Sequence, residues 1–196
     1  PPTPWNRSHR AVSIKIWDEA AEDQQIRAEL PTGPPPETWA VTGRVERGDF
    51  SAAAAGGLAA GTQAMLEKGG TPRLARALAV AAARELEEET GLSLGRPPEL
   101  GGFFYLCRAI TPPSLPIRFH ARFLVMGEEG AEGTLGGSGE LEGLRFHALG
   151  EAALGALPWI TAQVVAELKA WLRLPGPVRA GGRPTAVYRD RVRREE

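Results

Sequence analysis

Cysteine is nearly absent from the 196-residue sequence, and the single thiol, Cys107, excludes an internal disulfide framework. Net charge is nearly absent too, because 24 Asp and Glu residues are balanced by 23 Lys and Arg residues to give −1. A chain without a strong net charge has no overall attraction for a polyelectrolyte. The composition therefore predicts neither a nucleic acid polymer nor a membrane surface as the partner.

Long apolar runs are also missing. No segment approaches the roughly 20 apolar residues that a membrane-spanning helix needs, and no signal peptide is visible. The length suits one domain with a sizeable core. We expect a soluble protein, and the lone cysteine favours the cytoplasm, where thiols stay reduced.

Glycine and proline are plentiful, with 24 and 17 residues, and they help to divide the chain. We expect an irregular arm at 1–10, one domain at 11–174, and an arginine-rich, poorly ordered tail at 175–196. Three consecutive prolines at 34–36 interrupt the domain, because proline can neither join a strand ladder nor continue a helix.

Apolar patterning predicts several strands and two firm helices. Strand patterns lie at 11–17, 38–43, 101–110, 116–126 and 144–149. Helices are predicted at 72–90 and 159–172, and the Ala- and Gly-rich stretch 50–70 is predicted as either a weak helix or a mobile loop. Strands joined by few helices indicate an α/β or α+β sandwich.

The helix at 72–90 carries an unusual acidic end. Proline suits its first turn at Pro72, and Gly91 suits the position just after its last turn. At 100° per residue, Glu85, Glu88 and Glu89 share an arc of roughly 100°. These carboxylates repel each other and lie where the helix dipole disfavours negative charge. Two interpretations remain open: a solvated acidic surface, or a site for a hard divalent cation.

The order of residues in "RELEEETGL" resembles the second half of the Nudix box. The matching positions are Arg84, Glu85, Leu86, Glu88, Glu89, Gly91 and Leu92. The resemblance implies an α/β fold, an α/β/α sandwich with a mixed β-sheet. It implies that Glu85, Glu88 and Glu89 bind Mg²⁺ or Mn²⁺ and that Arg84 orients a carboxylate. Leu86, Gly91 and Leu92 would be structural members of the box.

The first half of the box can be aligned in two ways. A rigid count leads back to Gly70 and places Arg76 where the box needs an acid. The segment "TGRVERGD" offers Gly43 and Asp49 instead, and we prefer this alignment because it keeps a carboxylate. The 34 residues at 50–83 then replace seven, which implies an insertion of about 27 residues, roughly 50–76. The backbone carbonyl near Gly43 would be a further metal ligand, and Asp49 a structural member.

The resemblance implies a metal-dependent hydrolase that cleaves the pyrophosphate linkage of a nucleoside diphosphate derivative. Such a substrate could be a dinucleotide, coenzyme A, a nucleotide sugar or a nucleoside triphosphate. The general base could be Glu85, Glu89 or Glu140. The alternative is a Nudix-fold module that binds a nucleotide without hydrolysis, although such modules typically lose box carboxylates. Homodimers are common among relatives, so a homodimer is compatible with the resemblance.

Substrate-binding residues are suggested by a basic strand face and by aromatic residues. Arg118, His120 and Arg122 alternate with apolar residues, so they share one face. That face could bind phosphate through guanidinium groups, or it could be the wet side of an antiparallel strand. His120 departs from the family pattern, which often has an acid there. Trp39 could stack on a base, although aromatic residues in strands more often belong to the core.

Overall fold

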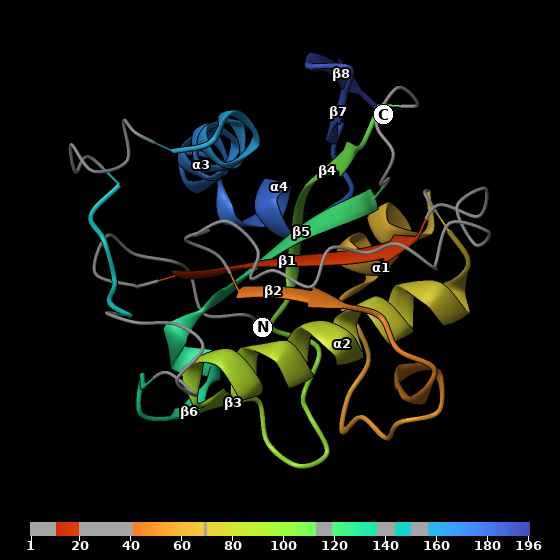
Figure 1. The fold of residues 1–196 in the computed structure, drawn as a ribbon, viewed down its shortest axis with the longest axis vertical. Helices are drawn as coiled ribbons and strands as arrows, with labels where there is room; N and C mark the ends of the chain where they lie inside the picture. The colour runs from red at the N-terminus through yellow and green to blue at the C-terminus, as the bar shows by residue number, and fades with distance from the viewer. Residues whose placement is uncertain (1–10, 20–40, 69, 113–118, 137–143, 150–156) are drawn as a thin grey trace, which may run out of the picture.

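A computed structural model describes residues 11–19, 41–68, 70–112, 119–136, 144–149 and 157–196, with the backbone alone at 11–19 and 41–43. Its centre is a six-stranded mixed sheet in the order β2-β1-β5-β4-β7-β8 (Figure 1). β1 is parallel to β2 and β4 is parallel to β7, whereas the other neighbours are antiparallel. Within these residues, the helices are all too short or too polar to cross a membrane.

The strands of this sheet include the predicted hairpin between two apolar segments. They are β1 (Ala11–Glu19), β2 (Val41–Arg44), β4 (Phe104–Ile110), β5 (Phe119–Gly127), β7 (Ala186–Arg189) and β8 (Val192–Glu195). β4 and β5 pair antiparallel, as predicted. A separate two-stranded sheet joins β3 (Leu92–Ser93) to β6 (Glu132–Gly133).

The longest helix, α2 (Pro72–Thr90), begins and ends at the predicted residues. The Thr71 side chain accepts a hydrogen bond from the Leu74 amide at 3.1 Å, which caps the first turn. At the other end Gly91 has a φ of +73°, a left-handed conformation that glycine adopts without steric cost. The remaining helices are α1 (Ala60–Glu67), α3 (Trp159–Leu172), α4 (Gly176–Ala180), and the short 3-10 turns η2 (Gly48–Phe50) and η3 (Glu128–Gly130).

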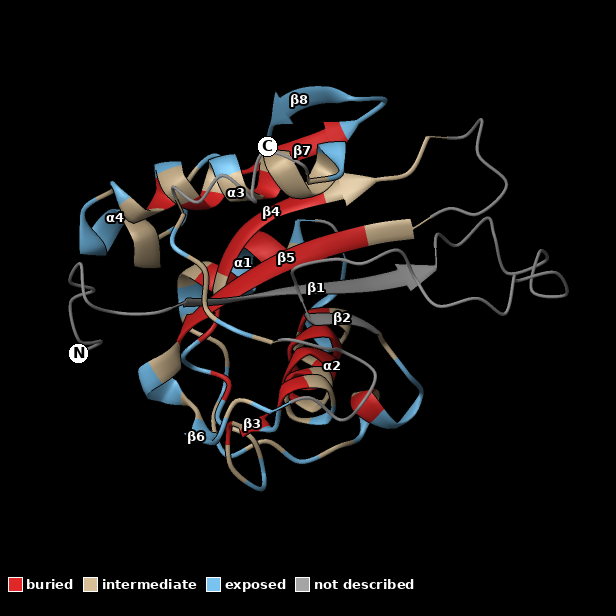
Figure 2. Ribbon diagram, turned by 60° about the vertical axis from the view of Figure 1, so that its left-hand side comes forward, coloured by how far each residue is buried: buried red, intermediate tan, exposed pale blue. Residues whose placement is uncertain are grey.

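Helices pack on both faces of the sheet, as Figure 2 shows. On one face, Leu124 and Met126 of β5 contact the apolar side of α1 and α2. On the other face, Phe123 and Val125 contact α3, where Trp171 is fully buried. Burial of each large apolar side chain stabilises the fold by roughly 1.5–3 kcal/mol relative to exposure. The fold is therefore α/β with a mixed sheet, as predicted at this level.

The Ala- and Gly-rich stretch is partly helical and packs on the rest of the protein. Thr62 in α1 donates a buried hydrogen bond to the Phe103 carbonyl at 2.8 Å. A Cβ on Gly61 would lie 2.1 Å from the Ala180 carbonyl oxygen, so only glycine permits this approach of α1 to α4. Of the two interpretations of this stretch, the helical one holds for 60–67.

Two sequence expectations are wrong. The segment 144–149 contains no strand, and the strand that pairs with β4 on the side away from β5 is β7. The segment 175–196 is not a poorly ordered tail, since it forms α4, β7 and β8 and extends the main sheet. Its apolar residues Ala186, Val187 and Tyr188 are buried, and this burial stabilises the segment. The scattered arginines made this apolar run hard to recognise in the sequence.

Candidate functional site

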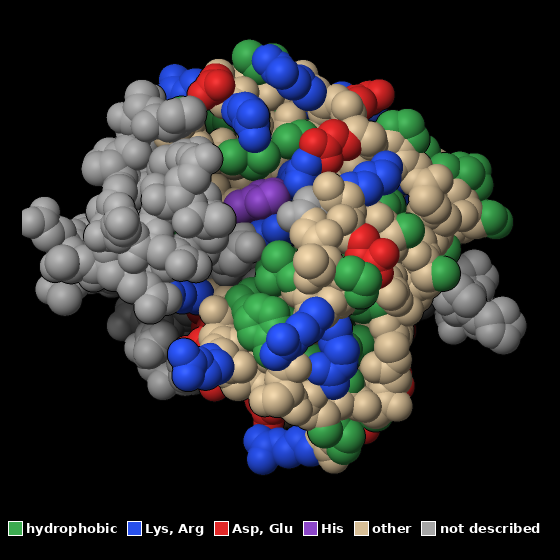
Figure 3. Space-filling view, turned by 90° about the vertical axis from the view of Figure 1, so that its right-hand side faces the viewer, with side chains coloured by type: hydrophobic (Ala, Val, Ile, Leu, Met, Phe, Trp, Pro, Cys, Tyr) green, Lys and Arg blue, Asp and Glu red, His purple; other side chains and the backbone are tan. Residues whose placement is uncertain are grey.

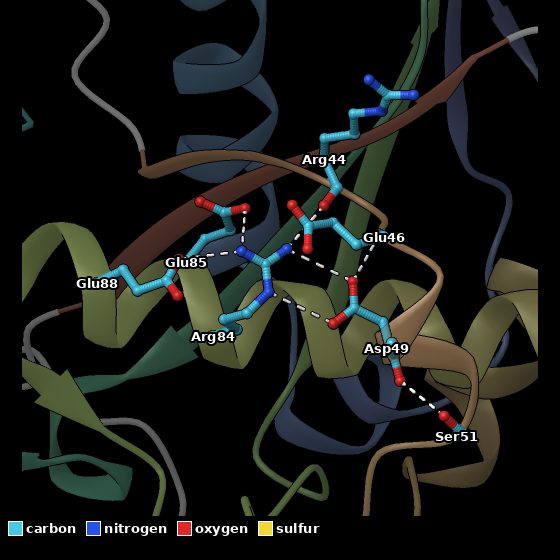
Figure 4. Close-up of polar contacts among 8 residues, drawn as sticks. Arg44, Glu46, Asp49, Ser51, Arg84, Glu85 and Glu88 are labelled. Carbon is cyan, nitrogen blue, oxygen red and sulfur yellow. Dashed lines mark hydrogen bonds and ion pairs between the residues drawn. The ribbon is translucent and has the colours of Figure 1, made fainter.

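The guanidinium group of Arg84 lies at the centre of an acidic site formed by Asp49, Glu85 and Glu88 (Figure 4). Its Nη1 atom is 2.8 Å from Glu85 Oε1 and 3.0 Å from Glu88 Oε2. Its Nη2 atom donates to the backbone carbonyl of Arg44 at 2.9 Å. One arginine thus connects the last turns of α2 to the end of β2.

Asp49 approaches the same guanidinium from the loop that follows β2. Its Oδ1 atom lies 3.4 Å from Arg84 Nε, and its Oδ2 atom accepts the Glu46 amide at 2.7 Å. The Asp49 side chain is only 5% exposed. A buried carboxylate needs a partner of opposite charge, and Arg84 provides it across 35 positions of sequence.

The electrostatics of the acidic site follow from partial burial and mutual attraction. Burial lowers the pKa of Arg84, but Asp49, Glu85 and Glu88 outweigh burial and raise it overall. Burial raises the pKa of Glu85 above its ordinary value, even though Arg84 and the Arg44 amide act in the opposite direction. Burial therefore disfavours the ionised form of Glu85 by more than Arg84 and the Arg44 amide stabilise it.

The remaining glutamates of α2 differ in their surroundings. The Glu88 side chain is 58% exposed, whereas Glu89 is half-buried. Glu87 forms an ion pair with Arg96 at 2.5 Å, so it points away from the acidic site, as its helical position predicts. In the part of the chain that the structure describes, no three His, Cys, Asp or Glu side chains gather into a preformed metal site.

The two alignments considered from the sequence differ in how close their glycine lies to the acidic site. Gly43 lies in β2, paired with Ile16 of β1, one residue before the Arg44 carbonyl that Arg84 contacts. Gly70 lies in the turn before α2, and a helix rise of 1.5 Å per residue separates that turn from Glu85 by roughly 20 Å. The loop beside the carboxylates is therefore the one that follows Gly43.

Arg76 and the apolar residues of the box have structural surroundings. Arg76 donates to the Ala52 carbonyl at 2.5 Å, so it contacts the start of the Ala- and Gly-rich stretch. Leu86 and Leu92 are buried in the core between α2 and the sheet. Gly91 closes the helix, and a Cβ there would lie 3.0 Å from the Thr134 carbonyl.

Of the other predicted residues, three lie outside the described part of the chain, namely Trp39, Arg118 and Glu140. Arg122 is described, and its side chain is almost completely buried, with 1% exposure. It donates to the His120 carbonyl at 2.8 Å. The interpretation of this strand face as a wet surface is therefore wrong at Arg122.

A second charged group was missed at the sequence level. Arg108 of β4 lies opposite Arg122 of β5 and contacts His120, and we call these three residues the basic cluster. Glu196 pairs with Arg108 from the C-terminal hairpin. The available signal was a single arginine in the otherwise apolar strand "FFYLCRAI". Figure 3 shows a face of the molecule on which Lys or Arg side chains lie next to a histidine.

Comparison with known proteins adds no assignment to this geometry. No family model, no curated protein and no solved structure matched the chain.

Proposed function

We propose that this protein is a divalent-metal-dependent hydrolase of the Nudix type. Its substrate would be a nucleoside diphosphate derivative, such as a dinucleotide, coenzyme A, a nucleotide sugar or a nucleoside triphosphate. The observation that carries the proposal is the contact of Arg84 with Asp49, the Arg44 carbonyl, Glu85 and Glu88. This contact joins a strand, a loop and a helix around clustered oxygen donors.

The donor set fits Mg²⁺ or Mn²⁺ by its chemistry, because both ions prefer carboxylate and carbonyl oxygens. The guanidinium of Arg84 contacts both Glu85 and Glu88, which indicates that positive charge is favoured between them. Glu85, Glu88 and Glu89, with a carbonyl near Gly43, would hold the ion. Bound metal would neutralise phosphate charge and lower the pKa of water.

The protein's own groups would position these parts and accept a proton. In the reaction, a water oxygen forms a bond to phosphorus, the bridging P–O bond breaks, and a carboxylate takes the proton of the water. Glu85 is suited to this role because burial raises its pKa. Glu89 and Glu140 are the other candidates for the base. Arg84 would keep Glu85 oriented, since its Nη1 atom lies 2.8 Å from the carboxylate.

Substrate binding would involve the predicted residues Arg118, Arg122 and Trp39. Arg122 lies on β5, and its register partner on β1, Ile16, is also the partner of Gly43. Strands are spaced by about 4.8 Å, so roughly 10 Å separates the backbones of Gly43 and Arg122. This separation is compatible with one extended nucleotide derivative that reaches both places.

The proposal is tested by phosphate release from a panel of nucleotides with Mg²⁺ or Mn²⁺. We expect Glu89→Gln to lower turnover by about 100-fold or more, since removal of a charged metal ligand impairs transition-state stabilisation. Glu87→Gln is the matched control, because Glu87 lies on the same helix but pairs with Arg96. This control should retain normal turnover.

Equal turnover by wild type and Glu89→Gln would contradict the metal-site assignment. Absence of turnover on every nucleotide, combined with measurable nucleotide binding, would support the binding module instead. Circular dichroism of both variants should match that of the wild type, which separates loss of chemistry from loss of fold.

A further inference from the structure

The basic cluster lies on the same face of the sheet as α2. Side chains alternate along β5, so His120 and Arg122 share a face with Leu124 and Met126. These two apolar residues pack on α1 and α2. Arg108 is paired with Arg122 in the register, and Ile110 is paired with His120. The strands therefore bring two arginines and a histidine to one place on this face.

Arg108 has an unused donor in a buried position. Only 7% of the residue is exposed, and its Nε atom has no hydrogen-bond partner among the described residues. Its Nη1 atom lies 3.2 Å from His120 Nε2, and its Nη2 atom pairs with the Glu196 carboxylate. A buried N–H without a partner is unfavourable, so an acceptor that reached it would bind favourably.

His120 is neutral in this environment. Burial lowers its pKa to about 3, and the nearby charges of Arg122, Arg108 and Arg189 act in the same direction. A neutral imidazole can accept a hydrogen bond from Arg108 and adds no positive charge that would repel the guanidinium. The histidine thus helps to orient Arg108 toward whatever anion occupies the cluster.

Glu196 directly follows β8 and contacts the cluster with a side chain that stays partly accessible. Its backbone exchanges two hydrogen bonds with Thr185, at 2.9 and 3.0 Å. Alternation along the hairpin directs Glu196 to the α2 face, whereas Arg193 reaches Glu167 of α3 on the opposite face. The Glu196 side chain is 40% exposed. Because water reaches it, another anion could replace it at Arg108 at modest cost.

We propose that Arg108, together with His120 and Arg122, binds a phosphate group, and that the Glu196 carboxylate occupies this place when no ligand is bound. The guanidinium fork of arginine matches phosphate geometry and forms charge-assisted hydrogen bonds. Glu196 would then be an internal competitor that sets the affinity of the site. Binding of a further phosphate of the hydrolase substrate at this site rests on the proposed function. The existence of the anion site does not depend on the proposed function.

The test is isothermal titration calorimetry with inorganic phosphate and with adenosine diphosphate, in EDTA and at constant ionic strength. Without divalent metal, the outcome is independent of the acidic site, so failure here is distinguishable from failure of the proposed hydrolase. Glu196→Gln should bind both probes about three- to tenfold more tightly, because the competing charge is removed. Arg108→Gln should weaken binding about tenfold or more.

Glu195→Gln is the matched control, because Glu195 is the neighbouring acid on the hairpin but pairs with Arg193. It should leave the affinity for both probes unchanged. Tighter binding of the nucleotide than of inorganic phosphate would identify a nucleotide phosphate as the ligand, and equal affinities would identify free phosphate. Unchanged affinity in Glu196→Gln, or no binding of either probe to this variant, would overturn the proposal.

Discussion

The acidic site and the basic cluster contrast in how each contacts a residue of opposite charge among the described residues. In the acidic site Arg84 contacts several acids, whereas in the basic cluster the Glu196 carboxylate contacts Arg108. Arg84 is part of a long helix, and its side chain is 27% exposed. Glu196 continues an edge strand, and its side chain is 40% exposed. The positive charge of Arg84 is built into the fold, whereas the Glu196 carboxylate is open to exchange with another anion.

This difference determines which charge the fold depends on. Loss of Arg84 would leave Asp49 buried without its cation, and a buried unpaired charge is strongly destabilising. Loss of the Glu196 charge would leave Arg108 with water at one edge and with His120 at another. We therefore expect loss of Arg84 to act mainly on stability and loss of the Glu196 charge to act mainly on binding.

Arg84→Ala should produce the largest effect on stability. We expect a loss of about 2–3 kcal/mol in the free energy of unfolding, a value reduced from that of a fully buried pair because Arg84 is partly solvated. Urea unfolding followed by circular dichroism measures it. Arg96→Ala is the control, because Arg96 is exposed and pairs with Glu87 on the surface; its unfolding midpoint should not change.

A second change sharpens the interpretation of Arg84→Ala. Asp49→Asn removes the carboxylate charge that Arg84→Ala leaves unpaired, so the double variant should be more stable than Arg84→Ala alone. If the losses of the two single variants simply add, the interaction of Asp49 with Arg84 does not account for the destabilisation.

The acidic site was more predictable from the sequence than the basic cluster, because it depends mainly on one helix. The period of α2, Pro72 in its first turn and Gly91 at its end are local signals, and they set which carboxylates share a face. Asp49 was harder to place, since 34 residues separate it from Arg84. Only its resemblance to an acid in a known turn suggested that Asp49 belongs with the helix glutamates, and its contact with Arg84 was not predicted.

The basic cluster depends on tertiary pairing that local patterns do not contain. Arg108 meets Arg122 only through the register of β4 and β5, which includes an irregularity between Tyr105 and Cys107. Glu196 reaches Arg108 only because β7 adds to the sheet beside β4. The short apolar run of β7 gave too weak a signal among the arginines of this segment.

A fall in pH should distinguish the basic cluster from the acidic site. Burial holds the pKa of His120 at about 3 in the folded state, below the ordinary value of 6.5. The unfolded chain therefore binds the proton first, and stability decreases as the pH falls from about 6.5 toward 3. This contribution amounts to at most about 1.4 kcal/mol per pH unit.

His120→Gln should remove that part of the acid sensitivity, measured as the free energy of unfolding in urea between pH 7 and about pH 4. The backbone neighbour of His120 on β1 is Asp18, and the arginines that face the imidazole are Arg122, Arg108 and Arg189. Identical pH profiles for the variant and the wild type would show that His120 is not held neutral.

The smallest expected effect on stability belongs to Glu85→Gln, although it should abolish a response to metal. Burial raises the pKa of Glu85, so its ionisation costs stability as the pH rises above its ordinary pKa of 4.5. At neutral pH the variant should be as stable as the wild type or more stable, by less than about 1 kcal/mol after solvent screening.

Mg²⁺ should raise the Tm of the wild type, since a ligand of the folded state stabilises it, but not that of Glu85→Gln. Glu87→Gln should keep the full Mg²⁺ response. A clear destabilisation by Glu85→Gln would instead indicate that Glu85 stabilises the fold through Arg84, as Asp49 does. The acidic site would then no longer contain one acid that stabilises the fold and another that binds metal.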